Sequence, residues 1–136
     1  MIKLKDLINE PVKSYEVDSD ERSSLQKKYD ELASNLIEIP IIINGEKILT
    51  NDIGECIMPH DHKYTLAKYH KADKDLALHA IESSLESWNE WSKTDLDYRI
   101  NIFRKAAILL AGKWRDTINA ATMLNQSKNA FQAEID

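Results

Sequence analysis

The sequence predicts an α+β fold in which a small antiparallel strand cluster is followed by amphipathic helices. A β-branched run over residues 37–43 ends at Asn44-Gly45, a residue pair that strongly favours a two-residue hairpin turn. From about residue 73 onward, the apolar residues recur with helical spacing instead of strand spacing. This change of period predicts that strands come first and helices follow.

Composition limits the size and the class of the protein. The chain has 136 residues, of which 43% are hydrophobic and 30% charged, so we expect one folded unit with its own core. A formal net charge of -5 argues against a nucleic-acid partner, because such surfaces are normally rich in Lys and Arg.

We expect a soluble, cytoplasmic protein. Cys56 is the single cysteine, so no intrachain disulfide can form, which suits a reducing compartment. The first ten residues mix acidic and basic side chains and do not build the apolar run of a signal peptide. No segment reaches the roughly 18 consecutive apolar residues of a membrane span.

The N-terminal part divides into an arm and a helix. Residues 1–19 have weak periodicity and a break at Pro11, and we expect an irregular arm whose order depends on docking. A helix is predicted over about residues 20–35, because Ser19 can cap it and apolar residues follow at helical spacing. The folded domain is therefore expected to span residues 20–136.

Four strand segments are expected after this helix. They are residues 37–43, 47–50, 55–58 and 65–70, the last two separated by a turn at residues 59–62.

Two long helices are expected next. Asp73 or Asp75 begins the first, and Thr94 or Asp95 caps the second, which ends near Gly112. Each has one apolar stripe. The stripes are Leu78, Ile81, Leu85, Trp88 and Trp91 in the first helix and Leu96, Ile100, Phe103, Ala107 and Leu110 in the second.

Two further helices complete the chain. One is predicted at about residues 114–124, with Ile118 and Ala121 facing inward. The other begins after Ser127 and has Phe131 and Ile135 four residues apart. Because it ends on acidic residues, which oppose the negative end of the helix dipole, we expect a chain that is truncated within a helix.

Short motifs follow one another in a distinctive order along residues 20–136. They are Ile39-Pro-Ile-Ile-Ile-Asn-Gly45, Met58-Pro-His-Asp-His62, Phe103-Arg-Lys-Ala-Ala107, Asn125-Gln-Ser-Lys128 and Gln132-Ala-Glu-Ile-Asp136. Together they resemble the 1-pyrroline-5-carboxylate dehydrogenase branch of the aldehyde dehydrogenase superfamily. One departure is Ser127, where this branch commonly has Gly.

The resemblance implies that the chain is the N-terminal part of the NAD-binding half of an α/β enzyme. Such enzymes oxidise glutamate γ-semialdehyde to glutamate with NAD in proline catabolism. The chemistry needs a cysteine thiolate, oxyanion donors, a nicotinamide and a carboxylate that activates water. In this family these groups lie beyond the first 136 residues. We therefore expect a chain that has no catalytic residue, binds no NAD and is inactive alone.

The resemblance also implies partners and a candidate site. The partners would be the remainder of the same enzyme and, in a homo-oligomer, further copies. The candidate residues lie at the start of the last helix, which in the family runs along the substrate side of the active site. They are Gln126, Lys128, Gln132 and Glu134, for which a structural role is the alternative.

Other chemically suggestive residues have ordinary explanations. Cys56 lacks an activating neighbour and is interpreted as structural. His60 and His62 are interpreted as turn residues, and no metal is expected, because no third ligand stands at a recognised spacing. Trp88 and Trp91 continue an apolar stripe, which favours packing over a stacking platform.

Two alternatives to this reading stay open. One is a different aldehyde dehydrogenase, such as a succinate semialdehyde enzyme. The other is a helical interaction module without catalytic function.

Overall fold

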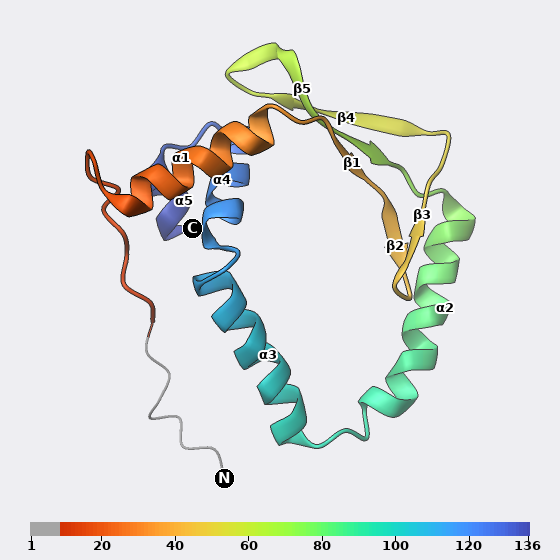
Figure 1. Cartoon of the computed structure of the whole chain (residues 1–136). Helices are drawn as coiled ribbons and strands as arrows, with labels where there is room; N and C mark the ends of the chain where they lie inside the picture. Colours follow the sequence, from red (N-terminus) through yellow and green to blue (C-terminus); the bar gives the residue numbers. More distant parts are fainter. Residues whose placement is uncertain (1–8) are drawn as a thin grey trace.

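The chain folds around two small sheets, and two long helices lead away from them and back to the N-terminal helix (Figure 1). This computed structural model describes residues 9–136. Residues 1–8, which belong to the predicted arm, lie outside the described part. Residues 9–19 form neither helix nor strand and lead into α1 (Asp20–Ala33).

Helix α1 begins where its capping residue predicts. The Ser19 hydroxyl accepts a hydrogen bond from the backbone N–H of Arg22 at 3.3 Å, and the acidic Asp20 and Glu21 occupy the positive first turn. Leu25 is buried on the inner face of the helix. The predicted helix over 20–35 is confirmed to within two residues.

The run 37–43 is not one strand. Pro40 divides it into β1 (Ile37–Ile39) and β2 (Ile41–Ile43), which belong to different sheets. Proline has no N–H to give to a hydrogen-bonded ladder, so a continuous strand is interrupted there. The expectation of a single strand was wrong because it counted β-branched residues and gave Pro40 too little weight.

The first sheet has the strand order β1-β5-β4. Strands β4 (Ile53–Met58) and β5 (Asp61–His70) are antiparallel, whereas β1 lies parallel to β5. The expectation of a wholly antiparallel cluster was therefore wrong for β1. The connection from β1 to β5 passes through β2, β3 and β4, and this length of chain allows β1 to run in the same direction as β5.

The second sheet is the predicted hairpin. Strands β2 and β3 (Glu46–Ile48) are antiparallel and are joined by Asn44 and Gly45, whose φ angles are 49° and 80°. Two consecutive positive φ angles are typical of a type I′ turn, and Asn-Gly is the pair that accommodates them best. The hairpin prediction is confirmed.

The helices begin close to their predicted positions. Asp73 caps α2 (Lys74–Trp91), and its carboxylate accepts a hydrogen bond from the Leu76 N–H at 2.9 Å. Helix α3 (Leu96–Ala111) lies between Asp95 and Gly112. Helix α4 (Arg115–Gln126) returns beside α1, and α5 (Ala130–Ile135) follows it.

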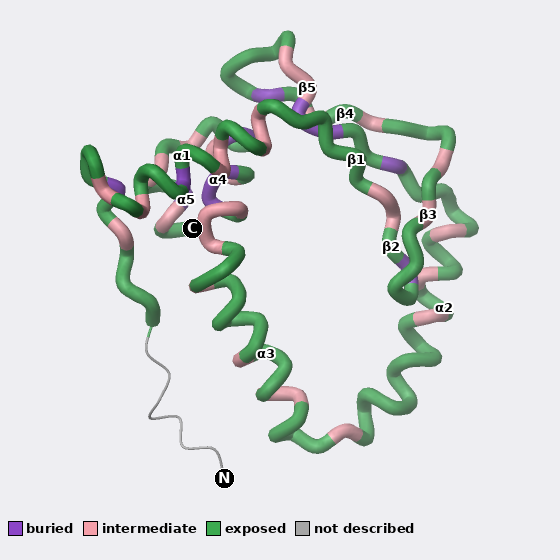
Figure 2. Tube along the Cα trace, in the orientation of Figure 1, coloured by how far each residue is buried: buried purple, intermediate pink, exposed green. Residues whose placement is uncertain are grey.

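The core lies where α1 and α4 meet each other and the first sheet (Figure 2). Its buried apolar side chains form two clusters. They are Tyr15, Leu25 and Ala120 in one cluster and Met58, Leu66 and Leu124 in the other.

The predicted inward face of α4 was wrong. Ile118 and Ala121 are exposed, and the buried residues are Asn119, Ala120 and Leu124. The helix is rotated by one residue relative to the expectation, because the amide of Asn119 can be buried once it has hydrogen-bond partners.

The apolar stripes of α2 and α3 do not form a core. Neither helix contains a buried residue, and Trp88 and Trp91 are 61% and 39% exposed. Phe131 and Ile135 on α5 are also exposed, and Ala133 is the buried residue there. In the described part of the chain, no second layer covers these faces (Figure 2). No helix among residues 9–136 is long and apolar enough to cross a membrane.

Candidate functional site

Glu134 on α5 is the most buried of the four candidate residues. Only 1% of its side chain is exposed. Its carboxylate accepts hydrogen bonds from the Lys13 backbone N–H at 2.7 Å, the Tyr15 hydroxyl at 2.7 Å and the Asn119 amide at 2.8 Å. It also forms an ion pair with Arg115, whose Nε lies 3.2 Å from Oε2.

This environment changes the acidity of two groups. Burial alone would raise the pKa of Glu134, but the hydrogen bonds from Arg115, Lys13, Tyr15 and Asn119 outweigh burial and lower its pKa to about 2. Burial and the neighbouring Glu134 carboxylate raise the pKa of Tyr15 to about 12. Glu134 is therefore ionised and Tyr15 is neutral across the physiological pH range.

The effect of this cluster is to hold the N-terminal arm against the end of the chain. Arg115 also donates a hydrogen bond to the carbonyl of Pro11 at 2.6 Å, so one guanidinium joins the arm, α4 and α5. Tyr15 is only 5% exposed although its backbone φ is 52°, an unfavourable value for a residue with a side chain. Both carboxylate oxygens of Glu134 accept hydrogen bonds from donors within the chain.

Gln132 has a different structural task. Its side chain accepts a hydrogen bond from the Asn129 N–H at 3.1 Å, and its own N–H donates to the Asn129 side chain at 2.8 Å. This reciprocal pair is a capping box, and it starts α5. Gln132 therefore fixes the helix that carries Glu134.

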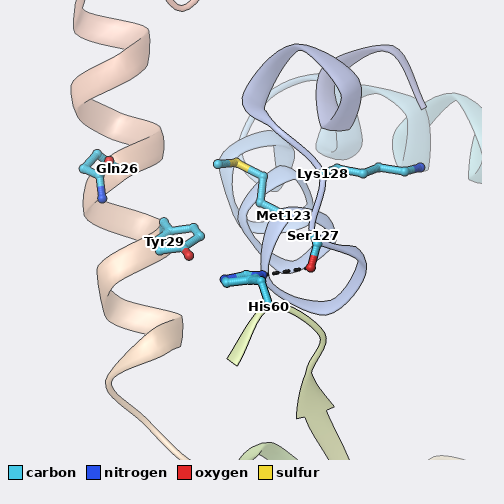
Figure 3. Close-up of a pocket in the computed structure, with 6 residues that line it drawn as sticks. All are labelled: Gln26, Tyr29, His60, Met123, Ser127 and Lys128. Carbon is cyan, nitrogen blue, oxygen red and sulfur yellow. Dashed lines mark hydrogen bonds between the residues drawn. The ribbon is translucent and has the colours of Figure 1, made fainter. Parts of the chain in front are cut away.

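Lys128 lines a pocket of about 270 Å³ that has both polar and apolar walls, and Gln126 is not part of this lining. Lys128 is paired with Asp136, and Gln126 is an exposed residue at the end of α4. The pocket lies between α1, the β4–β5 turn and the α4–α5 connection and is open to solvent, and its lining consists of Gln26, Tyr29, His60, Met123, Ser127 and Lys128 (Figure 3).

One hydrogen bond joins two of the residues that line this pocket. The His60 Nδ1 lies 2.8 Å from the Ser127 hydroxyl, while the Lys128 side chain points away from His60 (Figure 3). Ser127 adopts the left-handed conformation, with φ 54° and ψ 32°, which is strained for serine and favours glycine.

Cys56 lies in a second, apolar groove of about 280 Å³. The groove runs between α4 and the first sheet, and Leu66, Ala121 and Leu124 are among its walls. No cationic side chain that could activate a thiol is among the residues that line it. The geometry therefore fits the structural interpretation of Cys56.

The four candidate residues are not brought together as one site. Glu134 and Gln132 hold the arm and α5, whereas Gln126 and Lys128 lie toward the solvent. Among residues 9–136, no group of three or more His, Cys, Asp and Glu is placed to hold a metal ion.

Sequence reasoning missed the partners of Glu134. Tyr15 lies in a stretch without periodicity, so no pattern marks it as buried. Arg115 did offer a signal, because it is the first residue of α4 and a cation there opposes the helix dipole. Such a placement indicates a specific partner for the guanidinium.

Comparison with known proteins places this segment in a family. Residues 49–136 match the model of the aldehyde dehydrogenase family. The chain belongs to this family. The match spans β4 and β5 and all of α2 to α5, so it includes Arg115, Asn119 and Glu134, whereas the arm and α1, which complete the Glu134 cluster and both pockets, lie before it.

The similar proteins identify a branch of this family. The chain is 42% identical over 135 residues to the Delta-1-pyrroline-5-carboxylate dehydrogenase of Agaricus bisporus, which covers 98% of this chain and 25% of that protein. It is 39% identical over 128 residues to the human mitochondrial enzyme of the same name, covering 94% of this chain and 23% of that protein. The resemblance to the pyrroline carboxylate branch is confirmed.

A solved structure agrees in fold. The Mycobacterium tuberculosis Delta-pyrroline-5-carboxylate dehydrogenase bound with NAD is 36% identical, with a TM-score of 0.95 over 100% of this chain and 26% of that one. The predicted fold class, an α+β part of the aldehyde dehydrogenase fold, is likewise confirmed. This aldehyde dehydrogenase chain spans about a quarter of the length of the relatives it matches.

Proposed function

We propose that the chain is the N-terminal segment of an NAD-dependent 1-pyrroline-5-carboxylate dehydrogenase, which oxidises glutamate γ-semialdehyde to glutamate. The observation that carries the proposal is the 42% identity to a protein of that name across 98% of this chain. The TM-score of 0.95 to the Mycobacterium structure supports it, because the similarity extends to the arrangement of every element.

The described residues do not by themselves fit a dinucleotide. The glycines stand singly at positions 45, 54 and 112, and no glycine-rich loop is present that could cradle a pyrophosphate. We therefore assign NAD to the longer enzyme, and we derive no catalytic step from this segment. Its contribution is structural, because the Glu134 cluster anchors the arm and α5.

The four candidate residues enter this proposal unequally. Glu134 and Gln132 use their polar atoms within the chain, so we assign them a positioning role. Gln126 is exposed at the end of α4 and Lys128 lines the 270 Å³ pocket, and we keep both as candidates for the substrate side. The cytoplasm stays our expectation for location, although the human relative is named as mitochondrial.

A chimera tests the proposed function. The 136-residue chain would replace the matching segment of the Agaricus enzyme, and NADH formation would be followed with glutamate γ-semialdehyde and, separately, with succinate semialdehyde. We expect the chimera to oxidise glutamate γ-semialdehyde preferentially. We expect no NADH from the 136-residue chain alone, since it lacks the groups that the chemistry needs.

Two controls complete this experiment. The Agaricus remainder without the segment reports background, and the intact Agaricus enzyme reports the attainable rate. A folded chimera that prefers succinate semialdehyde would favour the alternative aldehyde dehydrogenase. Sustained NADH formation by the 136-residue chain would contradict the proposal that this segment is non-catalytic.

A further inference from the structure

His70 is a buried ionisable residue that joins the first sheet to the chain leaving the hairpin. It is the last residue of β5, and only 4% of its side chain is exposed. One ring nitrogen faces Thr50, which lies in the connection between β3 and β4, and the other faces Glu38 of β1. A single imidazole therefore contacts three separate segments of the chain, counting its own strand.

The nitrogen that faces Thr50 has two possible partners of opposite kind. Nδ1 of His70 lies 2.8 Å from the backbone nitrogen of Thr50 and 2.9 Å from its carbonyl oxygen. A ring nitrogen either accepts a hydrogen bond through its lone pair or donates one through its proton, and it cannot do both at once. The protonation state of Nδ1 therefore decides which of the two Thr50 groups is bonded.

The other nitrogen determines where the proton lies in the neutral ring. Nε2 is 3.3 Å from the carboxylate of Glu38, which when ionised can only accept a hydrogen bond. In neutral His70 the single ring proton is therefore favoured on Nε2, and Nδ1 accepts from the Thr50 N–H. In charged His70 both nitrogens carry protons, so Nδ1 donates to the Thr50 carbonyl and the Thr50 N–H loses its acceptor.

The surroundings of His70 act on its charge in opposite directions. Glu38 favours the charged ring, although its carboxylate is 65% exposed and screened by solvent. Burial of the ring disfavours the charge. The other charged groups near the ring are paired with each other, namely Asp52 with Lys71 at 3.0 Å and Glu55 with Lys68 at 4.0 Å. Neither form of the ring is therefore excluded.

The connection that contains Thr50 is also held by bonds that do not involve the ring. The Thr50 hydroxyl lies 3.0 Å from the Asp52 carbonyl and 3.1 Å from the Lys71 carbonyl. The Lys71 N–H donates to the Asp52 carbonyl at 2.9 Å. These bonds keep the connection beside the end of β5, so the backbone of Thr50 can exchange its bond to the ring without being released.

We propose that His70 makes the attachment of the β2–β3 hairpin to the first sheet sensitive to pH. The neutral ring binds the Thr50 N–H, and the protonated ring binds the Thr50 carbonyl instead. Histidine is the residue type whose charge ordinarily changes within the physiological pH range. Residues 49–52 connect the two sheets, so the exchange of partners acts at the joint between them. This inference goes beyond the proposed dehydrogenase function and depends on none of its steps.

Hydrogen exchange at the Thr50 backbone amide tests the proposal. The protection factor, which is corrected for the intrinsic pH dependence of exchange, should fall by about tenfold from about pH 8 to about pH 5, because the Thr50 N–H loses a hydrogen bond. Amides in α1 and α4 should keep their protection. A protection factor of Thr50 that does not change with pH would overturn the proposal. So would a parallel loss in α1 and α4, because that result reports unfolding of the chain.

Substitutions separate the titration of His70 from a purely structural role. His70→Gln keeps a side chain that can accept from the Thr50 N–H but does not titrate in this range, so the fall in protection with pH should disappear. Glu38→Gln removes the carboxylate that favours the charged ring, so the fall should occur at a lower pH. His79→Gln, at an exposed position on α2, is the matched control and should behave like the original chain.

The two variants at the contact give independent outcomes. Because Glu38 is 65% exposed, Glu38→Gln should fold and decides the question even if His70→Gln does not fold. The proposal is wrong if folded His70→Gln still loses protection at Thr50 as the pH falls. It is also wrong if Glu38→Gln leaves the midpoint of that loss at the same pH.

Discussion

At the scale of single residues, Glu134 shows how a buried charge can hold two distant ends of a chain together. Its carboxylate is removed from water, which disfavours the ionised form, but the guanidinium of Arg115 and three further donors compensate for that cost. The carboxylate is therefore held in one orientation. The same donors would be left without an acceptor if its charge were removed.

We expect Glu134→Gln to lower the free energy of unfolding by about 3 kcal/mol at neutral pH, because Arg115 would be left half-buried without its counter-charge. The loss of unfolding free energy in this variant should depend on pH. The pKa of Glu134 is lowered from 4.5 to about 2, so its stabilising contribution is present above pH 4.5 and is lost as the pH falls toward 2. Urea unfolding at several pH values measures both effects.

The matched control is Glu31→Gln on α1. The Glu31 carboxylate contacts Lys28 at the surface and is 55% exposed, so its loss should cost no more than about 0.5 kcal/mol. If Glu134→Gln behaves like this surface variant, the cluster does not anchor the arm. If the loss of unfolding free energy caused by Glu134→Gln is the same at pH 2 as at neutral pH, packing and not charge is responsible.

At the scale of elements, α5 is notable for its shortness. It has six residues, which is too few to be stable in isolation because helix nucleation is costly. Two features compensate for this cost: the capping box at Asn129 and Gln132, and the anchoring of Glu134. The helix is therefore stable because it is fixed near both ends.

Removal of the cap should loosen this helix. We expect Asn129→Ala to cost about 1 kcal/mol, because the N–H of Gln132 loses its acceptor. Hydrogen exchange at the backbone amides of residues 130–135 should accelerate more than exchange elsewhere. Asn101→Ala, an exposed asparagine inside α3, is the control and should not destabilise the chain. Equal protection of α5 in the two variants would refute the role of the cap.

At the scale of the whole molecule, the packing between α4 and the first sheet leaves a groove unfilled. This apolar groove has a volume of about 280 Å³, so the side chains of α4 and of the sheet do not fill the space between the two layers. Ala121 lines this groove from α4 and is small. A larger apolar residue there could fill space without displacing a buried neighbour.

We expect Ala121→Leu to raise the free energy of unfolding by about 1 kcal/mol, as cavity-filling substitutions commonly do. The control is Ala77→Leu on α2. Ala77 is exposed and lies outside the groove, so this substitution should leave the free energy of unfolding nearly unchanged. Thermal and urea unfolding of both variants decide the question. If Ala121→Leu is destabilising instead, the groove is too narrow for added volume and its walls are already in contact.

Local features were determined by the sequence alone. The Asn44-Gly45 turn and the end of α3 at Gly112 each depend on a few neighbouring residues, and both were predicted correctly. The start of α2 was narrowed to Asp73 or Asp75, and Asp73 is its cap. The family could also be inferred, because ordered motifs such as residues 132–136 are a property of the sequence. Periodicity located the α2 and α3 stripes, but how far each side chain is exposed depends on what covers the stripe, and periodicity does not identify that.

Tertiary structure alone decided the rest. The Lys13 N–H and the Glu134 carboxylate are 121 positions apart in the chain, and no local pattern relates them. The burial of Asn119 likewise depends on Tyr15 and Glu134, since an amide is stable in the interior only when it has partners there. The physical reason is the same in both cases: the free energy of a buried polar group is set by its neighbours in space, and the sequence specifies those neighbours only through the complete fold.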